Sequence, residues 1–143
     1  MIPSAARSDP RGPVRCGPVA APVAASTSLV LRYFEMWNTG QGAMADELLG
    51  AAYVEHAHPD LLGPAAARSL VPRVHGLFPS VVVSAEVVLA DSELVVVRTE
   101  VQPRDADGHP SGPRRGMALF RIADGKLAEQ WSWYEPVRAP THG

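Results

Sequence analysis

One pair of side chains in this sequence has the types and spacing for proton transfer. Arg98 and Glu100 are separated by one residue, and side chains two apart on a strand lie on the same face. A neighbouring guanidinium holds a carboxylate ionised, whereas a dry pocket raises its pKa. Such a pair can exchange a proton with an epoxide, a hydroxyl or an enol. We therefore expect Glu100 to move the proton and Arg98 to orient it or to stabilise an oxyanion. The alternative is that this pair faces solvent or a dimer partner, because Val95, Val97 and Val101 form the apolar face of the same strand.

A second group of polar residues lies upstream. A short strand is predicted over Tyr53 to His56. Tyr53 and Glu55 share one of its faces and are candidate catalytic residues, while His56 points to the other face unless a bulge intervenes. His56 is therefore a candidate catalytic residue or a structural histidine. The spacing of His56 and His58 could suggest a metal, but no carboxylate or further histidine has matching spacing. We predict no metal site.

A third group follows near the carboxyl end. Gln130, Ser132 and Tyr134 share one strand face, so Tyr53 and Tyr134 are expected to donate hydrogen bonds into a common pocket. Trp131 and Trp133 lie on the opposite face, where paired exposed tryptophans are typical of a contact surface.

The composition limits the classes of protein to consider. The chain has 143 residues, 46 % of them hydrophobic and 20 % charged, which fits one globular domain. A net charge of −2 disfavours a nucleic-acid partner. The single cysteine, Cys16, excludes an intramolecular disulfide and a cysteine-based zinc cluster. No apolar run is long enough for a membrane span, and prolines interrupt the amino-terminal region, so we expect a cytoplasmic protein without a membrane partner.

Helices are predicted in the first half of the chain. Residues 1–25 are rich in proline and alanine and are expected to form an extended tail. The domain is expected to span residues 26–138, with a helix starting at Ser26 or Ser28 and a short tail at 139–143. Apolar spacing predicts this helix up to Asn38, and further helices over about 43–49 and 63–77.

The second half has the period of two that is typical of strands. Four strands are predicted at 81–90, 93–102, 115–123 and 126–135, with a tight turn at Asp124-Gly125. The polar stretch 103–113 is predicted to be a mobile hairpin loop that could cover a pocket. Helices followed by an antiparallel meander indicate an α+β fold with the helices on one face of a curved sheet.

Several short strings, in their order along the chain, resemble one protein family. They cover about residues 28–135. Through these strings the chain resembles the SnoaL-like polyketide cyclases, which have the cone-shaped nuclear-transport-factor-2 fold. The strings are Trp37-Asn38-Thr39-Gly40, Tyr53-Val54-Glu55-His56, Phe78-Pro79, Val95-Val96-Val97-Arg98, Pro110-Ser111-Gly112 and Phe120 to Trp131.

The resemblance implies a deep apolar pocket inside the cone, chemistry without a cofactor, and a homodimer formed through the outer sheet face. In cyclases of this family that catalyse aldol addition, an aspartate and a histidine form an acid/base pair. The matching positions here are Ser132 and Ala118, so that pair is absent. The residues expected to bind a small-molecule substrate are Tyr33, Trp37, Phe78, Ala118, Phe120, Gln130, Ser132 and Tyr134.

Three functions remain open from the sequence. The first is a cyclase or isomerase acting on a polyketide-type intermediate, either with acid/base help or by shape alone. The second is an epoxide hydrolase, because a branch of the same superfold resembles Arg98-Thr99-Glu100 and Tyr53-Val54-Glu55. The third is a protein that binds an apolar small molecule without catalysis.

Overall fold

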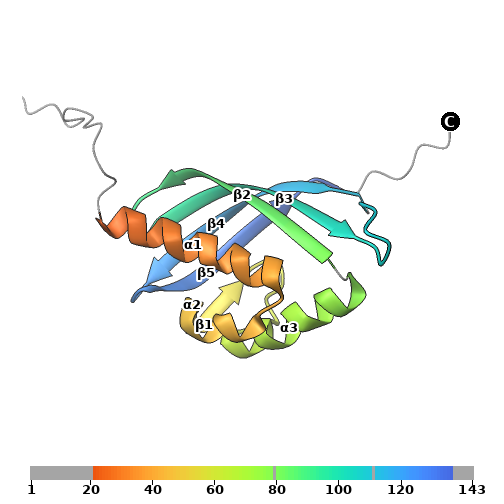
Figure 1. The fold of residues 1–143 in the computed structure, drawn as a ribbon. Helices are drawn as coiled ribbons and strands as arrows, with labels where there is room; N and C mark the ends of the chain where they lie inside the picture. Colours follow the sequence, from red (N-terminus) through yellow and green to blue (C-terminus); the bar gives the residue numbers. More distant parts are fainter. Residues whose placement is uncertain (1–20, 79, 111, 137–143) are drawn as a thin grey trace, which may run out of the picture.

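A computed structural model describes residues 21–78, 80–110 and 112–136 (Figure 1). Helices come first in the chain, and four of the five strands follow them. The helical elements are α1 (Ala21–Thr39), the 3₁₀ turn η1 (Gly42–Met44), α2 (Ala45–Leu48) and α3 (Gly63–Leu77). The strands are β1 (Leu49–Glu55), β2 (Ser80–Ala90), β3 (Leu94–Arg104), β4 (Arg114–Ala123) and β5 (Lys126–Tyr134).

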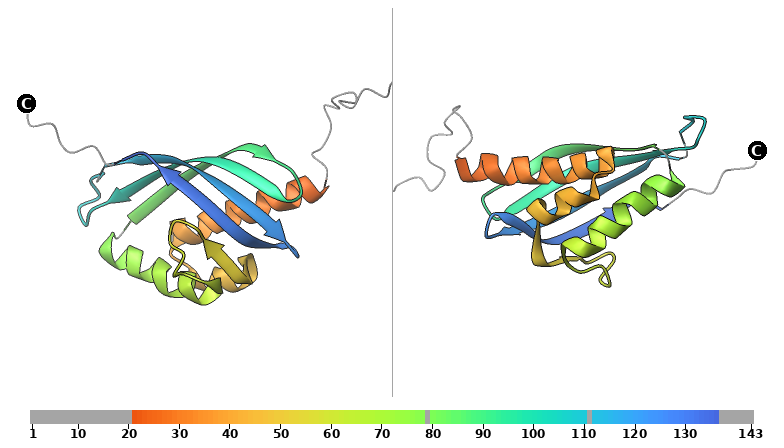
Figure 2. Two further views of the ribbon diagram at one scale, coloured as in Figure 1. Left: turned by 180° about the vertical axis from the view of Figure 1, so that it is seen from behind. Right: turned by 60° about the horizontal axis from the view of Figure 1, so that its bottom comes forward.

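The five strands form one curved, mixed sheet in the order β1-β5-β4-β3-β2. Strands β2 to β5 run antiparallel as a meander, and β1 pairs parallel with β5, placing Val54 beside Glu129. Figures 1 and 2 show the three α-helices on the same, concave side of the sheet. This is the predicted α+β fold. In addition, β1 pairs with β5, the last strand of the meander.

The core lies between α1 and the inner face of the sheet. Phe120 is fully buried and meets Tyr33 and Phe34 edge to face, at ring-centroid distances of 5.3 and 5.8 Å. Val95 and Val97 are also fully buried on the same face of β3. Alternation along each strand sends every second side chain into this core and leaves the others on the outer face.

Both ends of α1 are fastened to the strand β2 or its turn. The Ser26 hydroxyl, which is buried, contacts the Asp91 carbonyl oxygen at 2.7 Å and the Val23 carbonyl oxygen at 2.9 Å. The Asn38 amide bonds the Val83 backbone twice, donating to its carbonyl at 3.0 Å and accepting from its N–H at 2.6 Å. These bonds hold the helix across the open side of the sheet.

The predicted start of this helix is wrong. Ser26 lies within α1 rather than capping it, and residues 21–25 are helical rather than an extended tail. Pro22 is compatible with a helix because it stands in the first turn, where a missing N–H leaves no bond unmade. The remaining predicted tails, residues 1–20 and 139–143, lie outside the described residues.

Helix α3 and strands β2 to β5 agree closely with the predicted ranges, whereas β1 begins four residues before the predicted strand. Helix α3 occupies 63–77 and continues through Pro72, and β1 extends from Leu49 to Glu55, so that His56 follows the strand. Strand β3 includes Pro103 and Arg104, which the sequence assigned to the loop. No described helix is long and apolar enough to cross a membrane.

The turn between β4 and β5 depends on left-handed backbone. Asp124 has φ 53° and Gly125 φ 73°, the two positive φ values of the type I′ turn that joins twisted antiparallel strands. Gly125→Ala should lower the free energy of unfolding by about 1 kcal/mol, because a Cβ is strained in this region. Urea unfolding followed by circular dichroism measures the change.

A matched glycine variant separates strain from a general effect of alanine. Gly76 lies in α3, and apart from its chain neighbours and the backbone of its own helix no atom lies within 4 Å of an added Cβ. Gly76→Ala should therefore leave stability unchanged or raise it by about 0.5 kcal/mol. An equal loss of stability in the two variants would contradict the role given to the turn.

Candidate active site

A cavity of about 600 Å³ lies between the concave face of the sheet and the helices. Its walls come from α1, α3 and the inner faces of several strands, and they are mostly apolar. The polar groups come mainly from β1, β4 and β5, together with Tyr33 of α1 and His58 in the loop after β1. The apolar and aromatic lining is Phe34, Trp37, Leu61, Ala66, Ala67, Leu70, Val74, Val81, Val83 and Val101.

A run of hydrogen bonds crosses from β1 to β5 on the cavity wall. The Tyr53 hydroxyl donates to Gln130 Oε1 at 2.5 Å, and Gln130 Nε2 donates to Ser132 Oγ at 2.9 Å. The Ser132 hydroxyl then contacts Glu55 Oε2 at 3.4 Å. Every donor in the run therefore points toward the Glu55 carboxylate, which accepts at its end.

Glu55 is the acid/base candidate of this cavity. Burial raises the pKa of its carboxyl above the usual value of 4.5, although the Ala57 N–H and the Ser132 hydroxyl oppose part of the shift by hydrogen bonding to the charged form. The side chain is half-buried in an apolar cavity, where a carboxylate is a stronger base than in water. Among the described lining residues it is the one carboxylate.

Three tyrosines line the same cavity. Burial raises the pKa of Tyr33, Tyr53 and Tyr134 above the ordinary range of a phenol, so all three are neutral donors at physiological pH. The predicted role of Tyr53 as a donor to substrate needs correction, because its proton is held by Gln130. Tyr134 lines the cavity, and its role as a donor to substrate stays a prediction.

Gly116 makes room for Tyr134 on the inner face of the sheet. The two residues are paired across β4 and β5, and a Cβ at position 116 would lie 2.7 Å from Cδ1 of the tyrosine ring. The Tyr134 ring therefore lies directly over the β4 backbone at Gly116. The Arg114 guanidinium, on the same face of β4, lies 5.3 Å from the centroid of this ring, a cation–π distance.

Arg98 and Glu100 do not line this cavity. They point to the outer face of β3, where Arg98 forms an ion pair with Glu86 and the Glu100 carboxylate lies 3.0 Å from Arg115 Nε. They border a separate shallow hollow on that face. The prediction that this pair acts inside the cone is wrong, because the neighbouring residue Thr99 takes the inward position of the strand.

His56 also lies outside the cavity. Its ring stacks on Trp131 at a centroid distance of 4.6 Å and approaches Glu129 Oε1 at 3.5 Å. Trp133 is exposed on the outer face, as predicted for both tryptophans. The homodimer expected through that face stays a prediction.

The residues expected to bind substrate divide into two sets. Phe78 is 39 % exposed and outside the cavity lining, while Ala118 and Phe120 are buried beneath it in the core. These three expected contacts are corrected by the structure. The residues that do line the cavity are Tyr33, Trp37, Gln130, Ser132 and Tyr134, together with Tyr53 and Glu55.

The sequence analysis missed several parts of the lining, among them a stripe of α3 and Arg114. Ala66, Leu70 and Val74 recur every four residues along α3, a helical stripe that could have been recognised. Arg114 and Arg115 are adjacent in the sequence, and neither was singled out there. The two side chains alternate across β4, so Arg115 faces outward and Arg114 borders the cavity.

A possible cation-binding group lies in the β3–β4 hairpin. Asp105, Asp107 and His109 could each offer one ligand atom, and all three are exposed. One oxygen of Asp105 already accepts the backbone N–H groups of Asp107 and His109 at 2.9 Å. Asp105 is therefore explained by the two hydrogen bonds that it accepts within the turn.

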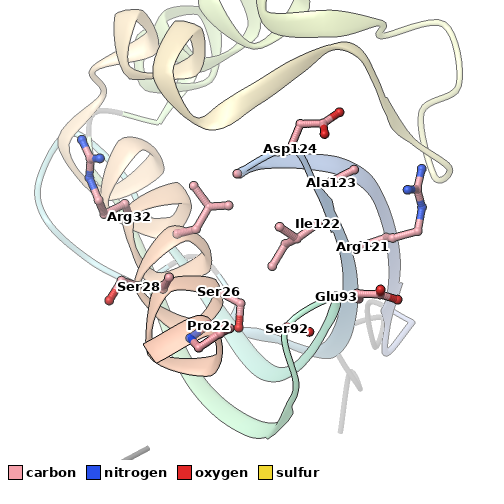
Figure 3. Close-up of a pocket in the computed structure, with 13 residues that line it drawn as sticks. Pro22, Ser26, Ser28, Arg32, Ser92, Glu93, Arg121, Ile122, Ala123 and Asp124 are labelled. Atoms are coloured by element: carbon pink, nitrogen blue, oxygen red, sulfur yellow. The ribbon is translucent and has the colours of Figure 1, made fainter. Parts of the chain in front are cut away.

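A second hollow, of about 720 Å³, lies at the other end of the cone (Figure 3). It is bordered by the start of α1 and by the β2–β3 and β4–β5 turns. Ile122 points into it from β4, and its two arginines are already paired, Arg32 with Glu47 and Arg121 with Glu129. The candidate site is therefore the cavity that holds Glu55.

The sequence profile of the SnoaL-like domain matches residues 30–130. The chain belongs to this family. No curated protein matches the SnoaL-like chain. Among solved structures it is similar to TsrD from Streptomyces laurentii, with 18 % identity, a TM-score of 0.68 and coverage of 78 % of this chain and 89 % of that one.

Two further structures of the same fold are similar to this SnoaL-like protein. A SnoaL-like polyketide cyclase from Agrobacterium tumefaciens has 13 % identity and a TM-score of 0.65, over 78 % of this chain and 91 % of that one. IdmH from Streptomyces antibioticus has 17 % identity and a TM-score of 0.62, over 76 % and 91 % of the two chains. At such identities the likeness establishes the fold.

The raised pKa of Glu55 predicts a pH-dependent stability difference. Because the folded protein holds this proton more tightly than the unfolded chain, the contribution of Glu55 to stability is full below about pH 4.5 and is lost as the pH rises through the folded pKa. Glu55→Gln cannot ionise, so its melting temperature should rise relative to wild type across that window. Parallel melting profiles from pH 4 to 8 would contradict this account.

Proposed function

We propose that this SnoaL-like protein is a cyclase or isomerase that rearranges a small, mostly apolar polyketide-type intermediate without a cofactor. The observation that carries the proposal is the half-buried Glu55 carboxyl, which faces an apolar cavity and accepts the hydrogen-bond run from Tyr53. A carboxyl with a raised pKa, positioned by other side chains in a cleft, is typical of an acid/base group.

The reaction that fits these groups needs one base, which later acts as the acid. The Glu55 carboxylate removes a proton from a carbon between two carbonyl groups of the substrate. The enolate carbon attacks a second carbonyl carbon of the same molecule, and a carbon–carbon bond forms. The resulting alkoxide takes the proton back from Glu55, so the product is an isomer of the substrate.

The remaining groups have supporting roles. Tyr134 donates a hydrogen bond to the oxyanion that develops on the substrate, because its phenol is neutral and lines the cavity. Ser132 and Gln130 hold the Glu55 carboxylate toward the substrate. The apolar walls exclude water and fold the substrate close to its reactive geometry.

A pair of conservative variants tests the assignment of the base. Glu55→Gln should lower kcat by about 100-fold or more, since it removes the proton-transfer group and preserves its size. Glu100→Gln removes a carboxylate from the outer face and should leave kcat unchanged. The reverse pattern would return the catalytic role to Glu100, and unchanged rates in both variants would exclude acid/base catalysis by either residue.

Mass spectrometry in ¹⁸O-labelled water distinguishes the reaction classes. We expect one member of a panel of β-keto esters, polyenes and polyketide epoxides to give an unlabelled product of the same mass as its substrate. A product heavier by one labelled water would instead indicate an epoxide hydrolase. Ligand-induced thermal stabilisation without any product would indicate a binding protein.

A further inference from the structure

The cavity has a cation at its exposed edge. Arg114 lines the cavity and its side chain reaches solvent. Of the described residues that line the cavity, it is the one arginine or lysine. A guanidinium is charged at every relevant pH and offers a planar fork of donors that matches a carboxylate.

The surroundings of Arg114 differ from those of the arginines on the outer face. Arg98, Arg115 and Arg121 each lie within ion-pair distance of a glutamate. For Arg114, no carboxylate lies within that distance among the described residues. Its N–H donors therefore remain available to a ligand in the cavity.

The position of the guanidinium is restrained without using its donors. It lies over the Tyr134 ring at 5.3 Å from the centroid, and the ring itself lies over Gly116, where any larger residue would collide with it. A cation–π contact engages the face of the guanidinium and leaves the N–H groups at its edge free. Less side-chain entropy is therefore lost when an anion binds than for an unrestrained arginine.

We propose that Arg114 binds a carboxylate of the substrate, so that the cavity accepts an amphiphilic acid with its carboxylate at the rim and its apolar chain inside. This inference rests on the proposed function and specifies its substrate class as a free acid rather than a neutral ester or lactone. The acid group at the rim stays away from the like-charged Glu55, and the carbon chain extends toward that residue.

Isothermal titration calorimetry with decanoate and decanol tests the subsite without requiring turnover. The two probes share a ten-carbon chain and differ in the head group. At pH 7.5 and low salt, wild type should bind decanoate about fivefold or more tightly than decanol, and added salt should reduce this preference. Arg114→Gln should bind the two probes equally, while Arg114→Lys should keep part of the preference.

The neighbouring arginine supplies the matched control. Arg115 is adjacent on the same strand but faces the outer side of the sheet, so Arg115→Gln should keep the wild-type preference. The proposal is overturned if Arg114→Gln still prefers decanoate, if Arg115→Gln is the variant that loses the preference, or if wild type fails to bind decanoate at millimolar concentration. Both variants change an exposed side chain, and their melting temperatures check that the fold is intact.

The binding result and the turnover result can fail separately. Loss of the decanoate preference with Glu55-dependent turnover intact would remove the carboxylate subsite alone. An Arg114-dependent preference without turnover on any substrate would instead remove the cyclase proposal and leave a protein that binds amphiphilic acids.

Discussion

The parallel pairing of β1 with β5 is the constraint on which the candidate site depends. It brings a strand from the helical half of the chain to the end of the meander, with Glu55 beside Gln130 in register. Tyr53 and Glu55 from β1 thereby meet Gln130 and Ser132 from β5 on one wall. Each strand supplies only part of the run of hydrogen bonds. The Glu55 carboxylate comes from β1, and the Ser132 hydroxyl that bonds to it comes from β5.

The same arrangement explains how a charged group is tolerated among apolar walls. Burying an ionised carboxylate is unfavourable unless hydrogen bonds replace those made by water. Glu55 receives such bonds from the Ser132 hydroxyl and the Ala57 N–H, at 3.4 and 3.3 Å. Both distances are long, so the replacement is incomplete and burial dominates the shift in pKa. A fully satisfied carboxylate would be more stable and a weaker base.

The sequence predicted the elements well because their signals are local. The helical stripe of α3, the period of two from β2 to β5 and the Asp124-Gly125 turn depend on residues close together in the chain. The site was predicted less well, since it depends on which face of a strand is covered. Arg98 and Glu100 alternate with Val95, Val97 and Thr99, and it is the second set that the fold buries on the inner face of the sheet. No local pattern marks Arg114 rather than Arg115 as the inward residue.

The polarity of the hydrogen-bond run has a consequence for how protons travel. The Gln130 amide accepts only through its oxygen and donates only through its nitrogen, so it interrupts any exchange of protons between Tyr53 and Ser132. A continuous series of hydroxyl groups or water molecules could conduct a proton to solvent. This run of hydrogen bonds cannot, because the Gln130 amide lies in its middle. A proton taken up by Glu55 therefore leaves from the cavity side of its carboxyl and does not pass along β5 to Tyr53.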